Sequence, residues 1–239
     1  TLVLFTGGID LSIGGVLSLT NSLAATQMTD DPGSVVLWTV IILGIGVGAG
    51  LLNGFVVTVM RVTPFIATLA TWSIFKGLAL LVLSDPGGTA AEPLKDFVRG
   101  DQLGIPNSIL FTLLIIVVWL LFKRSRWGTR LYPIGSSESH AYFNGTAVQR
   151  TKLMAYVGSG LFAALAGLYR TVEISKGSPI AGDPFILQAV AAALVGGTAR
   201  MLVGEFFVLA SGVGTAAILS RLLILADRLL EHLARYRAL

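Results

Sequence analysis

A polar break in an apolar segment is the first place where this chain could do chemistry. Gly7 and Gly8 precede Asp10 and Ser12 close to the start of the sequence. The glycines relax the backbone, and the side chain of Asp10 or Ser12 can accept hydrogen bonds from the free amides of a helix that begins there. Non-helical backbone inside a membrane is tolerated only where it packs in protein or faces water. The break is therefore a candidate for part of a substrate path; the alternative is a satisfied helix cap at the membrane edge.

Common enzymatic motifs are missing from the chain. No glycine is followed by lysine, so the chain has no P-loop for ATP hydrolysis, and no serine lies in a Gly-x-Ser-x-Gly elbow. His140 and His232 lie far apart in sequence without the spacing of metal ligands, and the absence of cysteine excludes disulfides and cysteine-based zinc sites. We expect a protein that is not an enzyme and that binds neither a metal nor a cofactor itself.

The composition predicts an integral membrane protein. Apolar residues make up 54% of the chain and charged residues 13%, and the mean hydropathy is +0.80. A soluble domain of 239 residues does not need so much apolar surface, whereas the chain has room for several spans of about 20 residues. In such a protein the net charge of +4 records membrane orientation rather than nucleic-acid binding.

The expected fold is an all-α bundle of several membrane spans with broken helices near residues 7–12 and 185–198. The apolar segment 185–198 is too short for a crossing, ends in Gly196 and Gly197, and follows an outer loop that contains Lys176 and Pro179. The other apolar segments cover 2–28, 35–58, 64–83, 107–122, 153–172 and 202–226. The second of these carries three glycines at four-residue spacing, which favours close helix packing: Gly46, Gly50 and Gly54.

Charges between the segments predict the orientation. Residues 123–152 contain six basic residues and one acid, Glu138, which is typical of a cytoplasmic loop. Counting outward from it, the acidic loops 29–34 and 84–106 fall outside and Arg61 falls inside. The C-terminal tail conflicts with this count, because four arginines favour the inside: Arg221, Arg228, Arg235 and Arg237. Either 202–226 is a bent hairpin or a crossing is missing. We expect residues 1–239 to form one transmembrane domain that lacks N-terminal spans and part of the C-terminal region.

Several short motifs follow one another in a fixed order over residues 1–198. They lie at 7–14, 52–54, 63–69, 127–135, 150–152, 161–167 and 191–198. In this order they resemble the permease subunits of bacterial ABC importers for simple sugars, the ribose and xylose class. The chain departs from that pattern in three places. It has His140-Ala141-Tyr142 where Ala-Ala-Arg is common and Gln188 where an acid is common, and residues 199–205 do not form the usual glycine-rich turn.

The resemblance implies a set of partners in the bacterial inner membrane. Such permeases pair as homo- or heterodimers, receive a sugar from a periplasmic binding protein, and contact cytoplasmic ATPase subunits that use the ATP and Mg²⁺. No nucleic acid is involved. The contact is made by a short helix, which serine caps and glycine ends; the alternative is an ordinary basic loop. Here the helix would comprise Ser137, Glu138, His140, Ala141, Tyr142, Phe143, Asn144 and Gly145.

Four polar residues are candidates for the sugar path: Asp10, Ser12, Asn53 and Gln188. Together they offer the donors and acceptors that a neutral polyol needs. Three alternatives stay open. A branched-chain amino acid permease would need a base facing Asp10, for which Lys76 is the candidate. An ion-coupled carrier would use Asp10 as its proton or cation site. A degenerate, non-transporting membrane protein would fit the three departures.

Overall fold

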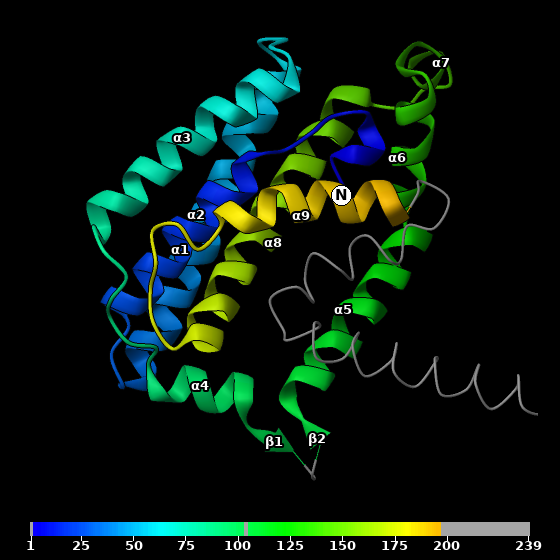
Figure 1. The fold of residues 1–239 in the computed structure, drawn as a ribbon. Coiled ribbons are helices and arrows are strands. Elements are labelled where there is room, and N and C mark those ends of the chain that lie inside the picture. The colour runs from blue at the N-terminus through cyan, green and yellow to red at the C-terminus, as the bar shows by residue number, and fades with distance from the viewer. Residues whose placement is uncertain (1, 103–104, 197–239) are drawn as a thin grey trace, which may run out of the picture.

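The computed structural model describes residues 2–102 and 105–196, and it is built almost entirely from helices (Figure 1). Two short strands, β1 (Asp101–Gln102) and β2 (Ile105–Pro106), pair antiparallel. The helices are η1 (Leu4–Thr6, a 3₁₀ turn), α1 (Ser12–Gln27), α2 (Pro32–Thr58), α3 (Pro64–Val82), α4 (Glu92–Arg99), α5 (Asn107–Arg124), α6 (Arg126–Ser136), α7 (Glu138–Phe143), α8 (Val148–Ile174) and α9 (Asp183–Gly196). The expected all-α class is confirmed.

Three of these helices are long and apolar enough to cross a membrane: α2, α3 and α8. The helices α5 and α6 meet at a bend of 63° and count as a fourth candidate span if they are taken together. Large apolar side chains stay exposed on the outer helices, for example Leu81 on α3 and Leu121 on α5. Exposed apolar surface of this extent is expected where a helix faces lipid. The described part of the chain therefore has the surface of a membrane protein.

The helix α2 lies directly against α8 through its three spaced glycines. A Cβ atom on Gly46 would clash with the backbone of Gly160, and one on Gly50 would clash with the carbonyl oxygen of Tyr156. Gly54 faces Leu153 less tightly, since a Cβ there would lie 3.1 Å from Leu153 Cα. The absence of side chains at these positions lets the two backbones approach, as small residues do between membrane helices.

We expect Gly50→Ala to destabilise the protein by about 1–3 kcal/mol, because the added methyl group must push the α8 backbone away. Thermal unfolding of the purified full-length protein in detergent measures the change. Gly48→Ala is the matched control, since a methyl group added to Gly48, on the same helix, would have no other atom within 4 Å. An equal effect of both substitutions would show that the α2–α8 contact is not tight at Gly50.

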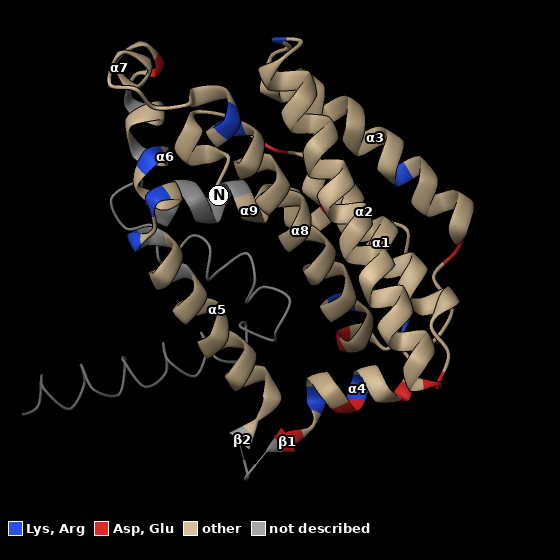
Figure 2. Ribbon diagram, turned by 180° about the vertical axis from the view of Figure 1, so that it is seen from behind, with Lys and Arg blue, Asp and Glu red and all other residues tan. Residues whose placement is uncertain are grey.

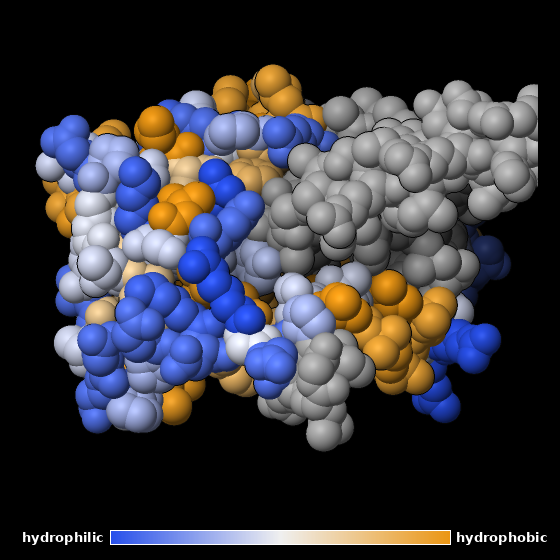
Figure 3. All heavy atoms as spheres, turned by 60° about the horizontal axis from the view of Figure 1, so that its bottom comes forward, coloured by the Kyte–Doolittle hydropathy of each residue, from blue (hydrophilic) through white to orange (hydrophobic). Residues whose placement is uncertain are grey.

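The two ends of the bundle differ in charge (Figure 2). One end, called here the basic end, holds α6, α7 and the α2–α3 connection with Arg61. The opposite, acidic end holds α4 and the α1–α2 connection, which are joined where the Glu92 amide donates to Asp30 Oδ1 over 2.8 Å. Hydrophilic side chains gather over this end (Figure 3). The structure thus separates Arg61 and residues 124–152 from residues 29–34 and 84–102, as the charge pattern predicts.

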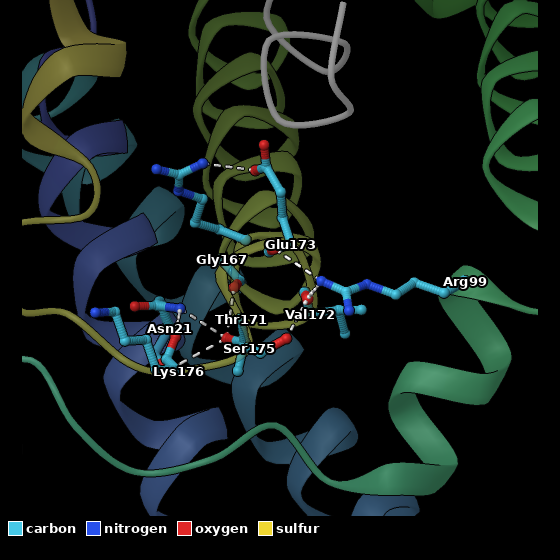
Figure 4. A network of polar contacts seen from close by, with 9 residues as sticks. Asn21, Arg99, Gly167, Thr171, Val172, Glu173, Ser175 and Lys176 are labelled. Atoms are coloured by element: carbon cyan, nitrogen blue, oxygen red, sulfur yellow. Dashed lines mark hydrogen bonds and ion pairs between the residues drawn. The ribbon is translucent and has the colours of Figure 1, made fainter.

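The end of α8 is held at the acidic end by polar contacts from two other helices (Figure 4). Arg99 of α4 donates to the carbonyl oxygens of Val172 and Glu173, over 2.5 and 2.8 Å, in the last turn of α8, where Val172 also accepts from the Ser175 amide. Asn21 of α1 donates to Thr171 Oγ1 over 2.8 Å. These bonds fix α1, α4 and α8 relative to one another.

After α8 the chain turns back into the bundle, which differs from the expected outer loop. Ser175 adopts a left-handed conformation with φ of 55°, and residues 176–182 then run along α1. Asn21 Oδ1 accepts from the Ser178 amide over 2.6 Å, and Ser18 Oγ accepts from the Gly182 amide over 2.9 Å. Residue 182 must be a glycine for the chain to follow this path, because a Cβ atom at that position would clash with the backbone of α1.

The helix α9 therefore begins inside the bundle, beside the start of α1, and runs across the other helices (Figure 1). With 14 residues it is short for a crossing, as its sequence predicts. The break expected near 7–12 is present, whereas the glycine-rich end of 185–198 extends past Gly196. That end, the apolar segment 202–226 and the arginines of the tail lie outside the described residues.

Candidate functional site

The side chain of Asp10 stabilises the break between η1 and α1. Gly7 has φ of 76°, a conformation that favours glycine, and ends η1. Asp10 Oδ1 then accepts hydrogen bonds from the Ser12 amide over 3.0 Å and from Ser12 Oγ over 2.6 Å. Asp10 therefore satisfies a free amide in the first turn of α1, and its negative charge lies at the positive end of the helix dipole.

The same carboxylate is the centre of a chain of buried hydrogen bonds, called here the Asp10 network and made of Asp10, Ser12, Asn53, Thr71 and Ser159. Ser159 Oγ donates to Asp10 Oδ2 over 2.6 Å. On the other side, Asn53 Nδ2 donates to Ser12 Oγ and Thr71 Oγ1 donates to Asn53 Oδ1, each over 2.7 Å. The five residues are at most 9% exposed. They come from α1, its preceding break, α2, α3 and α8.

All of these bonds are directed toward the carboxylate. Thr71 donates to Asn53, Asn53 donates to Ser12, and Ser12 and Ser159 donate to Asp10. This order suits an ionised carboxylate, which only accepts. No lysine or arginine of the described residues pairs with Asp10. The charge is thus balanced by three donors and a helix terminus, and the network ties the break to three long helices.

Sequence reasoning selects three members of this network, and the structure brings Asp10, Ser12 and Asn53 together. It misses Thr71 and Ser159, because a single hydroxyl in an apolar span is common and carries no spacing signal. Gln188 does not join the network: it lies on α9 with an exposed side chain.

Lys76 has a partner other than Asp10. Its Nζ lies 2.6 Å from Asp183 Oδ2 at the start of α9 and 5.0 Å from the centroid of the Trp72 ring. Both charged side chains are partly buried, at 26% and 34% exposed. The base that a zwitterion site would place opposite Asp10 is therefore engaged in holding α9 against α3.

We expect Lys76→Met and Asp183→Asn each to destabilise the protein by about 1–2 kcal/mol, since each leaves a partly buried charge without its partner. The double variant Lys76→Met with Asp183→Asn should lose less than the sum of the two single losses in a double-mutant cycle of unfolding free energies, because both charges are then removed together. The surface pair of Lys95 and Glu92 on α4 is the control, with a coupling near zero. Additive losses at Lys76 and Asp183 would contradict the coupling.

The segment from Ser137 to Gly145 forms the short capped helix that its sequence predicts. Ser137 Oγ accepts from the His140 amide over 3.3 Å, and the amide of Gly145, a residue with φ of 76°, donates to the Tyr142 carbonyl. Ala141 is buried against the bundle, while Tyr142 and Phe143 are 69% and 83% exposed.

The remaining residues of this segment complete α7 and its attachment. Glu138 in the first turn forms an ion pair with Lys152 of α8, and His140 and Asn144 lie on the exposed surface. The rings of Tyr142 and Phe143 contact each other edge to face, with centroids 5.9 Å apart. The helix α7, which is attached to α8, therefore exposes two aromatic side chains at the basic end.

Comparison with known proteins identifies a family for this chain. The sequence profile of the family described as "Branched-chain amino acid transport system / permease component" matches residues 1–228. A probable ABC transporter permease protein from Sinorhizobium fredii is 38% identical over 93% of this chain. A ribose import permease protein from Bacillus subtilis is 38% identical over 83%, and a fructose import permease protein from Bifidobacterium longum is 32% identical over 91%.

The chain spans 65%, 62% and 63% of the length of these three relatives, which is less than two thirds of each. No solved structure matches the chain.

Proposed function

The chain belongs to the permease family of the branched-chain amino acid transport system, and on this premise we propose that it is a subunit of an ATP-binding-cassette importer that moves a monosaccharide across the bacterial inner membrane. The observation that carries the proposal is α7, a short helix with two exposed aromatic side chains at the basic end. Aromatic side chains are the residues that most often anchor a protein partner.

A sugar is favoured over an amino acid as the substrate. Of the three relatives described above, the two that are named for a substrate import ribose and fructose. An amino acid bound at Asp10 would also need an opposing base, since a zwitterion carries both charges, and no lysine or arginine of the described residues pairs with Asp10. Lys76 does not supply that base, since it pairs with Asp183.

The proposed assembly places the partners at the two ends of the bundle. Two copies, identical or related, pair in the bilayer; cytoplasmic ATPase subunits bind α7 at the basic end and use ATP and Mg²⁺; a periplasmic sugar-binding protein docks at the acidic end. The basic end faces the cytoplasm by the positive-inside rule. This chain then contributes alternating access and no catalysis, with no cofactor, metal or nucleic acid of its own.

Within this cycle we assign the Asp10 network to anchoring the broken helix. Its polar groups are satisfied by one another, so each sugar contact would have to replace an existing bond. Gln188 is better placed for direct contact, because its amide is exposed on α9 and offers both a donor and an acceptor.

Co-purification tests the proposal. The full-length protein is isolated with the ATPase that binds it, reconstituted, and assayed for ATP hydrolysis with binding proteins loaded with ribose, fructose or leucine. We expect stimulation by a sugar-loaded protein. Recovery of no ATPase would refute the importer, and stimulation by the leucine-loaded protein alone would refute the sugar.

A further inference from the structure

A cavity of about 500 Å³ lies at the basic end, between the η1–α1 break, the α2–α3 connection and the start of α8. Its lining includes Arg61, Glu138, Gln149, Lys152 and Tyr156. Neither the Asp10 network nor the contact surface of α7 uses this cavity. Three features of its lining have no structural explanation within the bundle alone.

The first feature is the hydroxyl of Tyr156. The residue is 1% exposed, yet its Oη has no hydrogen-bond partner among the described residues. The hydroxyl lies beside Gly8, which also lines the cavity and has no side chain to fill the space. A buried hydroxyl without a partner is costly and usually marks a missing water, ion or ligand.

The second and third features are the backbone and the charge of Arg61. Its φ of 57° is left-handed, which is strained for a residue with a long side chain, and such strain gathers at binding sites and hinges. Its guanidinium forms no ion pair with a described residue. The other cation in the lining, Lys152, pairs with the one carboxylate, Glu138. These three charged residues leave the lining with a net positive charge.

We propose that this cavity binds the phosphate group of a small molecule or of a lipid headgroup. A phosphate offers acceptors only, and the lining offers the matching donors: the guanidinium of Arg61, the ammonium of Lys152 and the hydroxyl of Tyr156. The cavity is several times larger than a phosphate ion, so it has room for the molecule that carries the group. The side-chain amide of Gln149, which is exposed in the same wall, can form hydrogen bonds to the uncharged part of the bound molecule.

The position of the cavity gives the bound molecule a means to act on the permease. It touches the α2–α3 connection and also Glu138, the first residue of α7. Lys152 and Tyr156 lie one turn apart on α8, and Ser159 of the Asp10 network follows on the same face. An occupant would therefore bridge α7 to the helix that carries the network. The site itself does not depend on the proposed transport function; only this effect on α7 does.

A thiol-protection experiment tests the site without any transport assay. The 239 residues hold no cysteine, so Gln149→Cys supplies a single thiol in the lining and Ser139→Cys a control thiol on α7, in otherwise cysteine-free full-length protein in a phosphate-free detergent. We expect inorganic phosphate or a hexose phosphate, at a concentration about ten times its Kd, to slow maleimide labelling of the Gln149→Cys protein about tenfold, because labelling slows by a factor of one plus the ratio of ligand concentration to Kd, and the free hexose to have no effect.

Removal of Arg61 decides the outcome. Arg61→Asn deletes the guanidinium and keeps a residue that accepts a left-handed backbone, so it should fold and lose the protection. Arg126→Asn, on exposed α6 outside the lining, should keep it. Labelling in phosphatidylglycerol nanodiscs without soluble phosphate tests a lipid source. Slower labelling there than in the phosphate-free detergent, if Arg61→Asn abolishes the difference, also supports the site. The proposal would be overturned if neither phosphate source slowed the labelling. It would also be overturned if the protection survived Arg61→Asn or if the free hexose protected equally well.

Discussion

Asp10→Ala is expected to lower the unfolding free energy by about 2–4 kcal/mol, because it leaves three buried donors without their acceptor. These donors are the Ser12 amide, Ser12 Oγ and Ser159 Oγ. The loss also removes the cap of α1 and the link between the break and α8. Denaturant or thermal unfolding of the full-length protein in detergent measures it, and transport in proteoliposomes should fall with it.

Two further variants separate the loss of the network from the loss of a charge. Asp10→Asn keeps an acceptor oxygen for Ser12 and offers an amide to Ser159, so it should cost less than half as much as Asp10→Ala. Asp85→Ala removes an exposed acid of the acidic loop and should change stability by less than about 0.5 kcal/mol. Wild-type stability and transport in the Asp10→Ala protein would contradict the anchoring role.

The kinetic pattern distinguishes an anchor from a sugar contact. If Asp10 only holds the broken helix, Asp10→Asn should lower the maximal transport rate and leave the apparent KM for the sugar nearly unchanged. A contact made by the carboxylate itself would instead raise KM at unchanged stability. Gln188→Ala offers the comparison, because its amide is exposed on α9 and its loss should not affect folding.

Local rules are enough to predict most helices of this fold. Proline at the first position marks the start of α3, and serine and glycine bound α7, whereas α2 begins at Pro32, three residues before the predicted start at 35. The polar break before α1 is predictable for the same reason, since its glycines, acid and serine are adjacent in sequence. Such signals lie within a few residues of one another and need no knowledge of the tertiary structure.

What the sequence could not predict depends on contacts between distant segments. Residues 176–182 have the glycine and proline content of an outer loop, yet they run into the bundle because Asn21 and Ser18 bind their amides. This path brings Asp183 to Lys76, which the sequence alone suggested as a base that could face Asp10. Thr71 and Ser159 enter the Asp10 network for the same reason: only helix packing selects them from other hydroxyls in apolar spans.

The double substitution Tyr142→Ala with Phe143→Ala is expected to weaken binding of the ATPase subunits about 100-fold or more and to abolish sugar-stimulated ATP hydrolysis. Each ring is more than two thirds exposed in the free chain, and buried aromatic anchors at protein interfaces are commonly worth about 2 kcal/mol or more. Titration of the purified ATPase against the permease in nanodiscs measures the affinity, and the ATPase assay measures the coupling.

The effect should be specific to the basic end. Phe97→Ala removes an exposed aromatic ring from α4 at the acidic end, and we expect normal ATPase affinity from that variant. The double variant should unfold at the wild-type temperature, because Ala141 and the pair of Glu138 with Lys152 still hold α7 in place. Full ATPase stimulation in the double variant would mean that α7 is a surface loop, and the importer would then have to couple through another part of the basic end.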